Sequence, residues 1–269
     1  MTLAAALGAL IGAILAFTGA GGGILAVPAL IFGMHLPMLQ AAPAALLAVG
    51  TSAAVGAVLG LHEGVVRYRA AMLIGALGMV TAPLGVVLAH WLPNRPLLVG
   101  FAALMIVLGV RALRGAAGVV TTGPRASAAV ARACHIDPRS GRLQWTAPCA
   151  RALAGTGVIS GLLSGLLGVG GGFVIVPALN RHTDLELRSV QATSLAVIAL
   201  VSVSGITASA WSGTVAWPVA GPFAAGATVA LVAGRRLARH IPVHHLHRLF
   251  AWLILAVAGL MLARAAGWF

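Results

Sequence analysis

The sequence predicts an all-α membrane protein built from two homologous halves, each with four hydrophobic segments. Of its 269 residues, 60% are hydrophobic and only 8% are charged, whereas a soluble domain needs more charge to cover its surface. Apolar runs long enough to span a bilayer follow one another almost end to end, and one glycine-rich motif occurs twice. We therefore expect a multi-pass protein of the cell inner membrane with seven to eight hydrophobic helices.

The internal repeat predicts the domain organisation. The motif GGGILAVPAL at Gly21–Leu30 returns as GGGFVIVPAL at Gly170–Leu179, an offset of 149 residues. The same offset aligns further glycines without a gap, as expected for two copies of one structural unit. The predicted domains are a first transmembrane repeat over residues 1–114, a cytoplasmic linker over 115–149 and a second transmembrane repeat over 150–269.

Each half begins with an anomalous apolar segment, at 3–34 and at 152–180. As one helix, the first would measure about 48 Å, whereas the hydrocarbon core is about 30 Å thick. Three glycines and a proline interrupt each segment, so we expect two half-helices that return to the side of entry. The other segments are expected to cross as helices, at 41–61, 70–91, 96–113, 190–210, 215–234 and 249–263.

The arginines predict how the segments are oriented. All 17 basic residues are arginines, against 4 acidic residues, and loops rich in basic residues stay cytoplasmic. If the leading segments re-enter, only Arg95 and Arg264 lie opposite the linker and the Arg235–Arg248 loop. We therefore expect the linker in the cytoplasm, both termini in the periplasm and an inverted repeat, as in many secondary transporters. Because the placement of arginines in cytoplasmic loops accounts for the excess of positive charge, no nucleic-acid partner is expected.

The two glycine breaks are the candidate substrate site. Glycine lets backbone N–H groups approach a ligand, and a helix that begins there presents unpaired N–H groups at its positive dipole end. Two such ends near the midplane would bind an anion without a buried cation; the alternative is close helix packing. The candidate substrate-binding residues are Thr18, Gly19, Gly21, Gly22, Gly23, Gly168, Gly170, Gly171 and Gly172, with Gln191, Thr193 and Ser194 in the following segment.

Other patterns favour structural roles. Glycines four residues apart, such as Gly8 with Gly12 and Gly157 with Gly161, are typical of close helix packing. The two cysteines, Cys134 and Cys149, lack a metal-binding spacing and are interpreted as reduced thiols. Residues 134–146 could form a small hairpin around a turn at 137–141.

The titratable residues do not predict an enzyme. The carboxylates all fall in predicted loops, which disfavours a cation or proton relay within the spans. The histidines between His240 and His247 are interpreted as part of a charged helix end rather than as a metal site. No catalytic constellation is recognisable, so we expect no enzymatic activity, no cofactor and no metal.

The sequence resembles the TauE/SafE family of sulfite and organosulfonate exporters. The resemblance rests on the GLLGVGGGF motif at Gly165–Phe173 with Val176-Pro177, on its first-half counterpart and on Gln191–Ser194. The first half departs from the second motif, with Ala42-Pro43-Ala44-Ala45. The resemblance implies a secondary transporter that exports a small anion such as sulfite or a sulfonate. The alternative is a channel-like or scaffold membrane subunit without independent transport; whether the protein forms a homodimer stays open.

Overall fold

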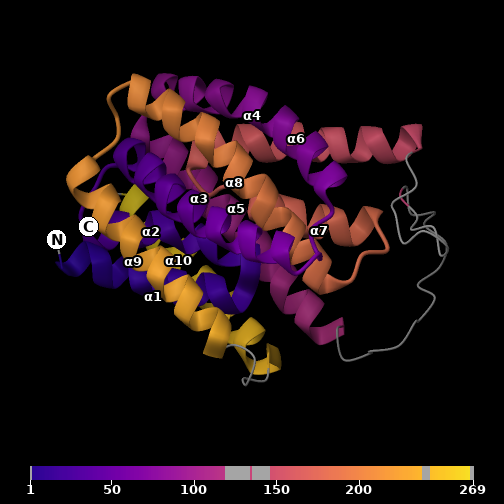
Figure 1. Ribbon diagram of the computed structural model, residues 1–269. Helices are drawn as coiled ribbons and strands as arrows, with labels where there is room; N and C mark the ends of the chain where they lie inside the picture. The colour runs from indigo at the N-terminus through magenta and orange to yellow at the C-terminus, as the bar shows by residue number, and fades with distance from the viewer. Residues whose placement is uncertain (1, 119–133, 135–145, 238–242, 267–269) are drawn as a thin grey trace.

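The computed structural model describes residues 2–118, 134, 146–237 and 243–266 (Figure 1). The side chains of residues 17–21, 114–118, 235–237 and 243–249 are not described. All regular elements in the described ranges are helices, which confirms the all-α class. They are α1 (Thr2–Thr18), η1 (Gly19–Leu25, a 3₁₀-helix), α2 (Ala26–Gly33), α3 (Met38–His62), α4 (Tyr68–Trp91), α5 (Asn94–Gly118), α6 (Ala147–Leu167), α7 (Gly172–His182), α8 (Leu187–Trp211), α9 (Trp217–Leu237) and α10 (Val243–Ala265).

The helix count differs from the predicted seven to eight. The described ranges contain ten α-helices, because each leading segment divides into two helices at its glycines. Six helices are long and apolar enough to cross a membrane, namely α3, α4, α5, α6, α8 and α9. The helix bounds keep the offset of 149: α3 and α8 match at both ends, and α4 and α5 begin 149 residues before α9 and α10.

Neighbouring helices come from opposite halves. Helix α1 packs against α9, and its counterpart α6 packs against α4; α3 packs against α8, and α5 against α10. Glycines permit the closest approaches: a Cβ added at Gly157 would lie 2.6 Å from the carbonyl oxygen of Ile74, and one at Gly8 would overlap the equivalent carbonyl of Phe223. The predicted packing role of these glycines is confirmed, because a side chain there would separate the helices.

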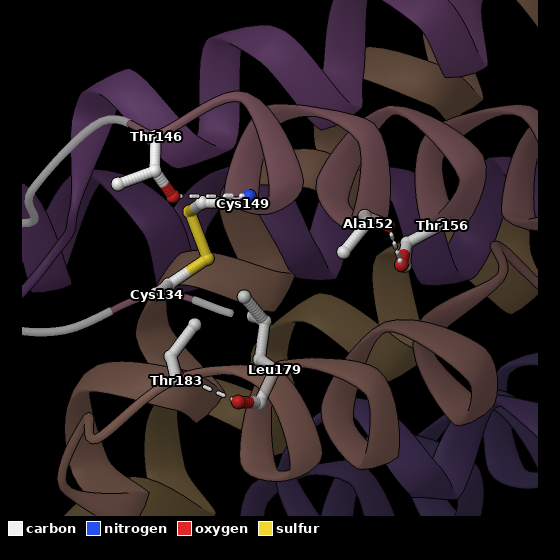
Figure 2. Close-up of a disulfide and its surroundings, with 7 residues drawn as sticks. All are labelled: Cys134, Thr146, Cys149, Ala152, Thr156, Leu179 and Thr183. Atoms are coloured by element: carbon white, nitrogen blue, oxygen red, sulfur yellow. Dashed lines mark hydrogen bonds between the residues drawn. A yellow bond between two sulfur atoms is a disulfide. The ribbon is translucent and has the colours of Figure 1, made fainter. Parts of the chain in front are cut away.

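The second leading segment doubles back on itself. The N–H of Cys134 donates to the carbonyl of His182 at the end of α7, at 3.0 Å, and Cys134 is bonded to Cys149 in the first turn of α6 (Figure 2). The start of α6 and the end of α7 therefore lie at the same end of the molecule. In the first half, Gly33 at the end of α2 packs against Leu7 of α1, so α2 also returns along the helix before it.

The two cysteines form a disulfide with a Cα–Cα separation of 4.9 Å, so their interpretation as reduced thiols was wrong. Metal spacing was the wrong criterion, because the pairing depends on where residue 134 lies in space. Its backbone pairs with the segment after α7, which places its side chain beside α6. Thr146 caps α6 by accepting from the N–H of Cys149 (Figure 2). The proposed hairpin turn and the side chains of the histidine cluster lie outside the described residues.

Arginines make side-chain contacts at both ends of the molecule. Figure 1 shows both termini at one end, opposite the end of α5 and the start of α6. At the terminal end, Arg264 of α10 donates to the carbonyl of Ile31 in α2, at 3.5 Å. At the other end, Arg188 of α8 pairs with Glu63 at the end of α3. We call this second end the linker end, since the predicted linker joins α5 to α6 there.

Candidate functional site

The second glycine break is a tight turn between α6 and α7. Gly168, Gly170 and Gly171 have φ values of 72°, 71° and 69°, a left-handed backbone that glycine adopts without strain. Gly168 ends α6 and Gly171 caps the start of α7. In the first turn of α7, the N–H groups of Gly172 and Phe173 precede any intrahelical acceptor, whereas the N–H of Val174 already donates to the carbonyl of Gly171, at 3.0 Å.

The structure brings the two glycine breaks together. A Cβ added at Gly23, in η1, would lie 3.3 Å from the carbonyl oxygen of Val169 and 3.1 Å from a methyl group of Val49. A Cβ at Gly170 would lie 3.2 Å from the same methyl group and 2.9 Å from Ile198. Val49 of α3 and Ile198 of α8 are themselves equivalent positions of the repeat. The breaks thus meet where α3 and α8 pass each other.

The glycines in the second turn face protein atoms. A Cβ at Gly171 would lie 2.7 Å from the carbonyl oxygen of Ser160, and one at Gly168 would overlap the carbonyl of Ala42. These residues are glycine because the backbone of the turn approaches neighbouring backbone, and the space of their missing side chains is filled. Gly22 and Gly172 are buried. Thr18, Gly19 and Gly21 belong to α1 and η1, but their side-chain surroundings are not described.

Gln191 lines a small pocket beside the first break. The pocket has a volume of about 60 Å³ and lies between the last turn of α1, the loop after α3 and the first turns of α8. Gln191 and Arg188 are its polar residues, and its lining contains no carboxylate. The lining residues are Leu15, Ala16, Val65, Arg188, Gln191, Ala192, Leu195 and Leu231.

Arg188 is held at this pocket by an ion pair. Its Nη2 donates to Oε2 of Glu63 at 2.9 Å, and the two side chains are 66% and 34% exposed. Ion pairs with this exposure contribute at most about 1 kcal/mol. An anion that reaches the pocket could therefore displace Glu63 from the guanidinium group at small cost.

Thr193 and Ser194 lie in the same turns of α8, but their hydroxyl groups already have partners within the protein. The Thr193 hydroxyl accepts from the backbone N–H of Arg67, at 3.0 Å, and so ties the α3–α4 loop to α8. The Ser194 hydroxyl donates to the carbonyl of Gln191, at 2.8 Å. Both side chains are fully buried. Of these three predicted residues, only Gln191 lines the pocket.

A second, smaller pocket occupies the equivalent place at the terminal end. It has a volume of about 10 Å³ and is lined by the starts of α3 and α5 and the ends of α4, α6 and α8. Where the first pocket has Arg188 and Gln191, the second has Leu39 and Ala42. The repeat thus provides two related pockets at opposite ends, and only the one at the linker end is cationic.

A larger crevice was not predicted from the sequence. It has a volume of about 860 Å³ and separates α5 and α10 from α6 and α7. Arg111, Arg151 and Arg181 line it at the linker end, and Gly172 and Ile24 line it near the breaks. The arginines come from three helices, so only their position beside the linker could have signalled that they converge. Among the described residues, no group of three or more His, Cys, Asp or Glu side chains could hold a metal ion.

Two curated proteins from Xylella fastidiosa are similar to the chain over most of its length. One, from strain Temecula1, is 29% identical over 257 residues, covering 93% of this chain and 90% of the relative. The other, from strain 9a5c, is 29% identical over 255 residues with the same coverage. Both carry the name "Probable membrane transporter protein". No solved structure matches the chain significantly.

The family comparison agrees with the fold. Six described helices can span a bilayer, and residues 4–261, nearly the whole chain, match one family of membrane transporters. The chain is accordingly a multi-pass membrane protein of the inner membrane and a transporter by family. It belongs to the sulfite exporter TauE/SafE family.

Proposed function

We propose that the protein is a secondary transporter that exports a small anion, sulfite or a sulfonate, and that it catalyses no chemical step. The observation that carries this proposal is the pocket beside the first break, where Arg188 and Gln191 face a space of about 60 Å³ without a lining carboxylate. A guanidinium group and an amide N–H₂ group are donors that bind oxyanions. The family description, sulfite exporter, supports the same substrate class.

The two pockets suggest a path for the anion. They occupy equivalent positions of the repeat at opposite ends of the molecule, and the glycine breaks meet between them. We propose that the halves form an inverted repeat and that the pockets open alternately, as in other transporters with such repeats. Backbone N–H groups at the start of α7 would replace part of the anion's hydration during passage.

The difference between the pockets supports different affinities at the two ends. An anion binds more tightly at Arg188 and Gln191 than where Leu39 and Ala42 take their places, because the second pocket has no guanidinium group. Net movement follows the gradients of the anion and of any coupled ion, and we propose movement from the linker end to the terminal end because the family is described as a sulfite exporter. This movement is export if the linker end is cytoplasmic.

The arginine distribution supports a cytoplasmic linker end. Of the eight arginines whose side chains the structure describes, Arg95 and Arg264 belong to the terminal end and the other six to the linker end, and basic loops stay in the cytoplasm. The disulfide between Cys134 and Cys149 lies at the same end, although disulfides persist mainly in oxidising compartments. Because basic loops set orientation during insertion, we propose that the linker end is cytoplasmic and that this disulfide is of the redox-sensitive kind found in the cytoplasm.

Flux measurements in liposomes test the proposal. Purified protein is reconstituted, and release of sulfite, a short alkyl sulfonate, sulfate and acetate is compared with release from protein-free liposomes. We expect protein-dependent release of sulfite or the sulfonate, and saturation with increasing substrate. A scaffold subunit would give no release above the protein-free rate for any of the four anions, and this result would refute the proposal.

A further inference from the structure

The crevice between α5, α10, α6 and α7 is far larger than a small oxyanion needs, and its walls are mainly apolar. It holds about 860 Å³, a size typical of sites for ligands as large as drugs. The wall residues from the middle of these helices are Leu104, Val107, Ile159, Phe173, Val174 and Ile254. An apolar space of this size is poorly solvated by water. Its walls therefore favour a ligand with a hydrocarbon part.

The linker end of the crevice has the opposite chemistry. Arg111, from the end of α5, Arg151, from the start of α6, and Arg181, from the end of α7, all line it there. No Asp or Glu is among the lining residues. Within the described part of the chain, none of these guanidinium groups forms an ion pair. Three cations without a counterion among the described residues favour an anionic group, and arginine binds phosphate with paired donors.

The repeat shows that these arginines are not needed for packing. The positions 149 residues away from Arg111, Arg151 and Arg181 are occupied by Leu260, Thr2 and Phe32, which are uncharged. The same helix arrangement is therefore built in the other half without cations at these three positions, and the cation that lies there, Arg264, already has protein partners in the carbonyl of Ile31 and the ring of Phe32. The helix arrangement shared by the two halves therefore does not require the arginine cluster. The cluster points instead to a ligand that binds at this crevice.

The position of the crevice identifies the source of such a ligand. α5 and α6 are both long and apolar enough to span the bilayer, so the wall between them lies at the level of the acyl chains. The arginines at the helix ends lie at the level of the headgroups. Basic pockets between transmembrane helices are suited to anionic lipid headgroups.

We propose that the crevice binds one anionic phospholipid from the leaflet at the linker end. Its phosphate lies among Arg111, Arg151 and Arg181, and an acyl chain lies along Phe173 toward Gly172 and Ile24. Because Gly172 and Ile24 belong to the two breaks, a bound lipid braces α7 against η1. This site is separate from the pocket of Arg188 and does not depend on which anion is transported.

Lipid binding to the full chain tests the proposal. Purified, delipidated protein is titrated with phosphatidylglycerol and with phosphatidylcholine, and bound lipid is counted by native mass spectrometry. We expect one tightly bound phosphatidylglycerol and weaker phosphatidylcholine binding. Arg181→Gln should weaken phosphatidylglycerol binding about fivefold, from the usual contribution of one basic residue at a membrane surface. Arg69→Gln removes the same charge outside the crevice lining and should leave binding unchanged.

A second variant tests the apolar wall. Gly155 lines the crevice, and a Cβ there would meet no atom within 4 Å, so Gly155→Leu narrows the crevice without disturbing the backbone. It should weaken the tight binding while the protein keeps its melting temperature in detergent. Equal binding of the two lipids, or equal losses for Arg69→Gln and Arg181→Gln, would overturn the proposal. Displacement of the lipid by a soluble alkyl sulfonate at lower concentration would also overturn it, because the crevice would then be a substrate site.

Discussion

Two glycines of α9 should respond in opposite ways to replacement by alanine. Gly226 lies against α1: a Cβ there would overlap the carbonyl oxygen of Ala5 and lie 3.1 Å from the backbone nitrogen of Ala9. Gly221, five residues earlier on the same helix, has no atom within 4 Å of an added Cβ. Replacing glycine by alanine inside a helix gains about 0.5–1 kcal/mol, and Gly221 gains less than Gly226 because it precedes Pro222. The stability difference between the variants is therefore a lower limit on the cost of disturbing the packing of α9 against α1.

The size of this stability difference follows from the contact between the added Cβ at Gly226 and the backbone of α1. Overpacking a well-packed interface costs about 1–3 kcal/mol, and backbone atoms cannot rotate away as a side chain can. Gly221→Ala should therefore be stabilised by up to about 1 kcal/mol, and Gly226→Ala should be less stable than Gly221→Ala by about 1–3 kcal/mol. At about 2–4 °C per kcal/mol for a chain of similar size, the melting temperatures in detergent should differ by several degrees. Equal melting temperatures would refute the assignment of Gly226 to a close helix contact.

Three further predictions concern single contacts. Cys134→Ser opens the disulfide, whose cysteines are 15 residues apart, and should cost about 3 kcal/mol under oxidising conditions, measured as a lower melting temperature without reductant. An unchanged melting temperature would show that the bond does not stabilise the fold. Glu63→Gln removes the ion-pair partner of Arg188 and should lower the KM for the transported anion by up to about fivefold. A raised KM would show that Glu63 assists binding. Thr193→Val removes the acceptor of the backbone N–H of Arg67 and should destabilise the protein by about 1–3 kcal/mol, measured as a lower melting temperature. An unchanged melting temperature would mean that water replaces the hydroxyl.

The helices could be predicted because their signals are local. Apolar runs gave the crossing helices to within six residues at either end, and the repeated glycines located the breaks at η1 and before α7. The all-α class and the membrane location needed only composition and run length. The division of each leading segment followed from comparing its length with the thickness of the bilayer.

The side-chain partners could not be predicted because they join helices from different parts of the chain. The Thr193 hydroxyl was a candidate substrate contact, but the loop after α3 approaches it and uses it as an acceptor. Arg111, Arg151 and Arg181 converge only when α5, α6 and α7 are placed together. The Cys134–Cys149 bond likewise depends on the segment after α7, which no spacing between the cysteines encodes.

The most direct test of the proposed export is the effect of one charge on flux. The initial rate of sulfite release from proteoliposomes is measured against sulfite concentration for the wild type, Arg188→Gln and Arg69→Gln, all at equal amounts of folded protein. Arg188 lines the pocket beside the first break, whereas Arg69 lies at the same end, over the ring of Tyr68. We expect a raised KM, with little release at low sulfite, for Arg188→Gln and wild-type rates for Arg69→Gln. Wild-type rates for both variants would contradict the assignment of the substrate pocket.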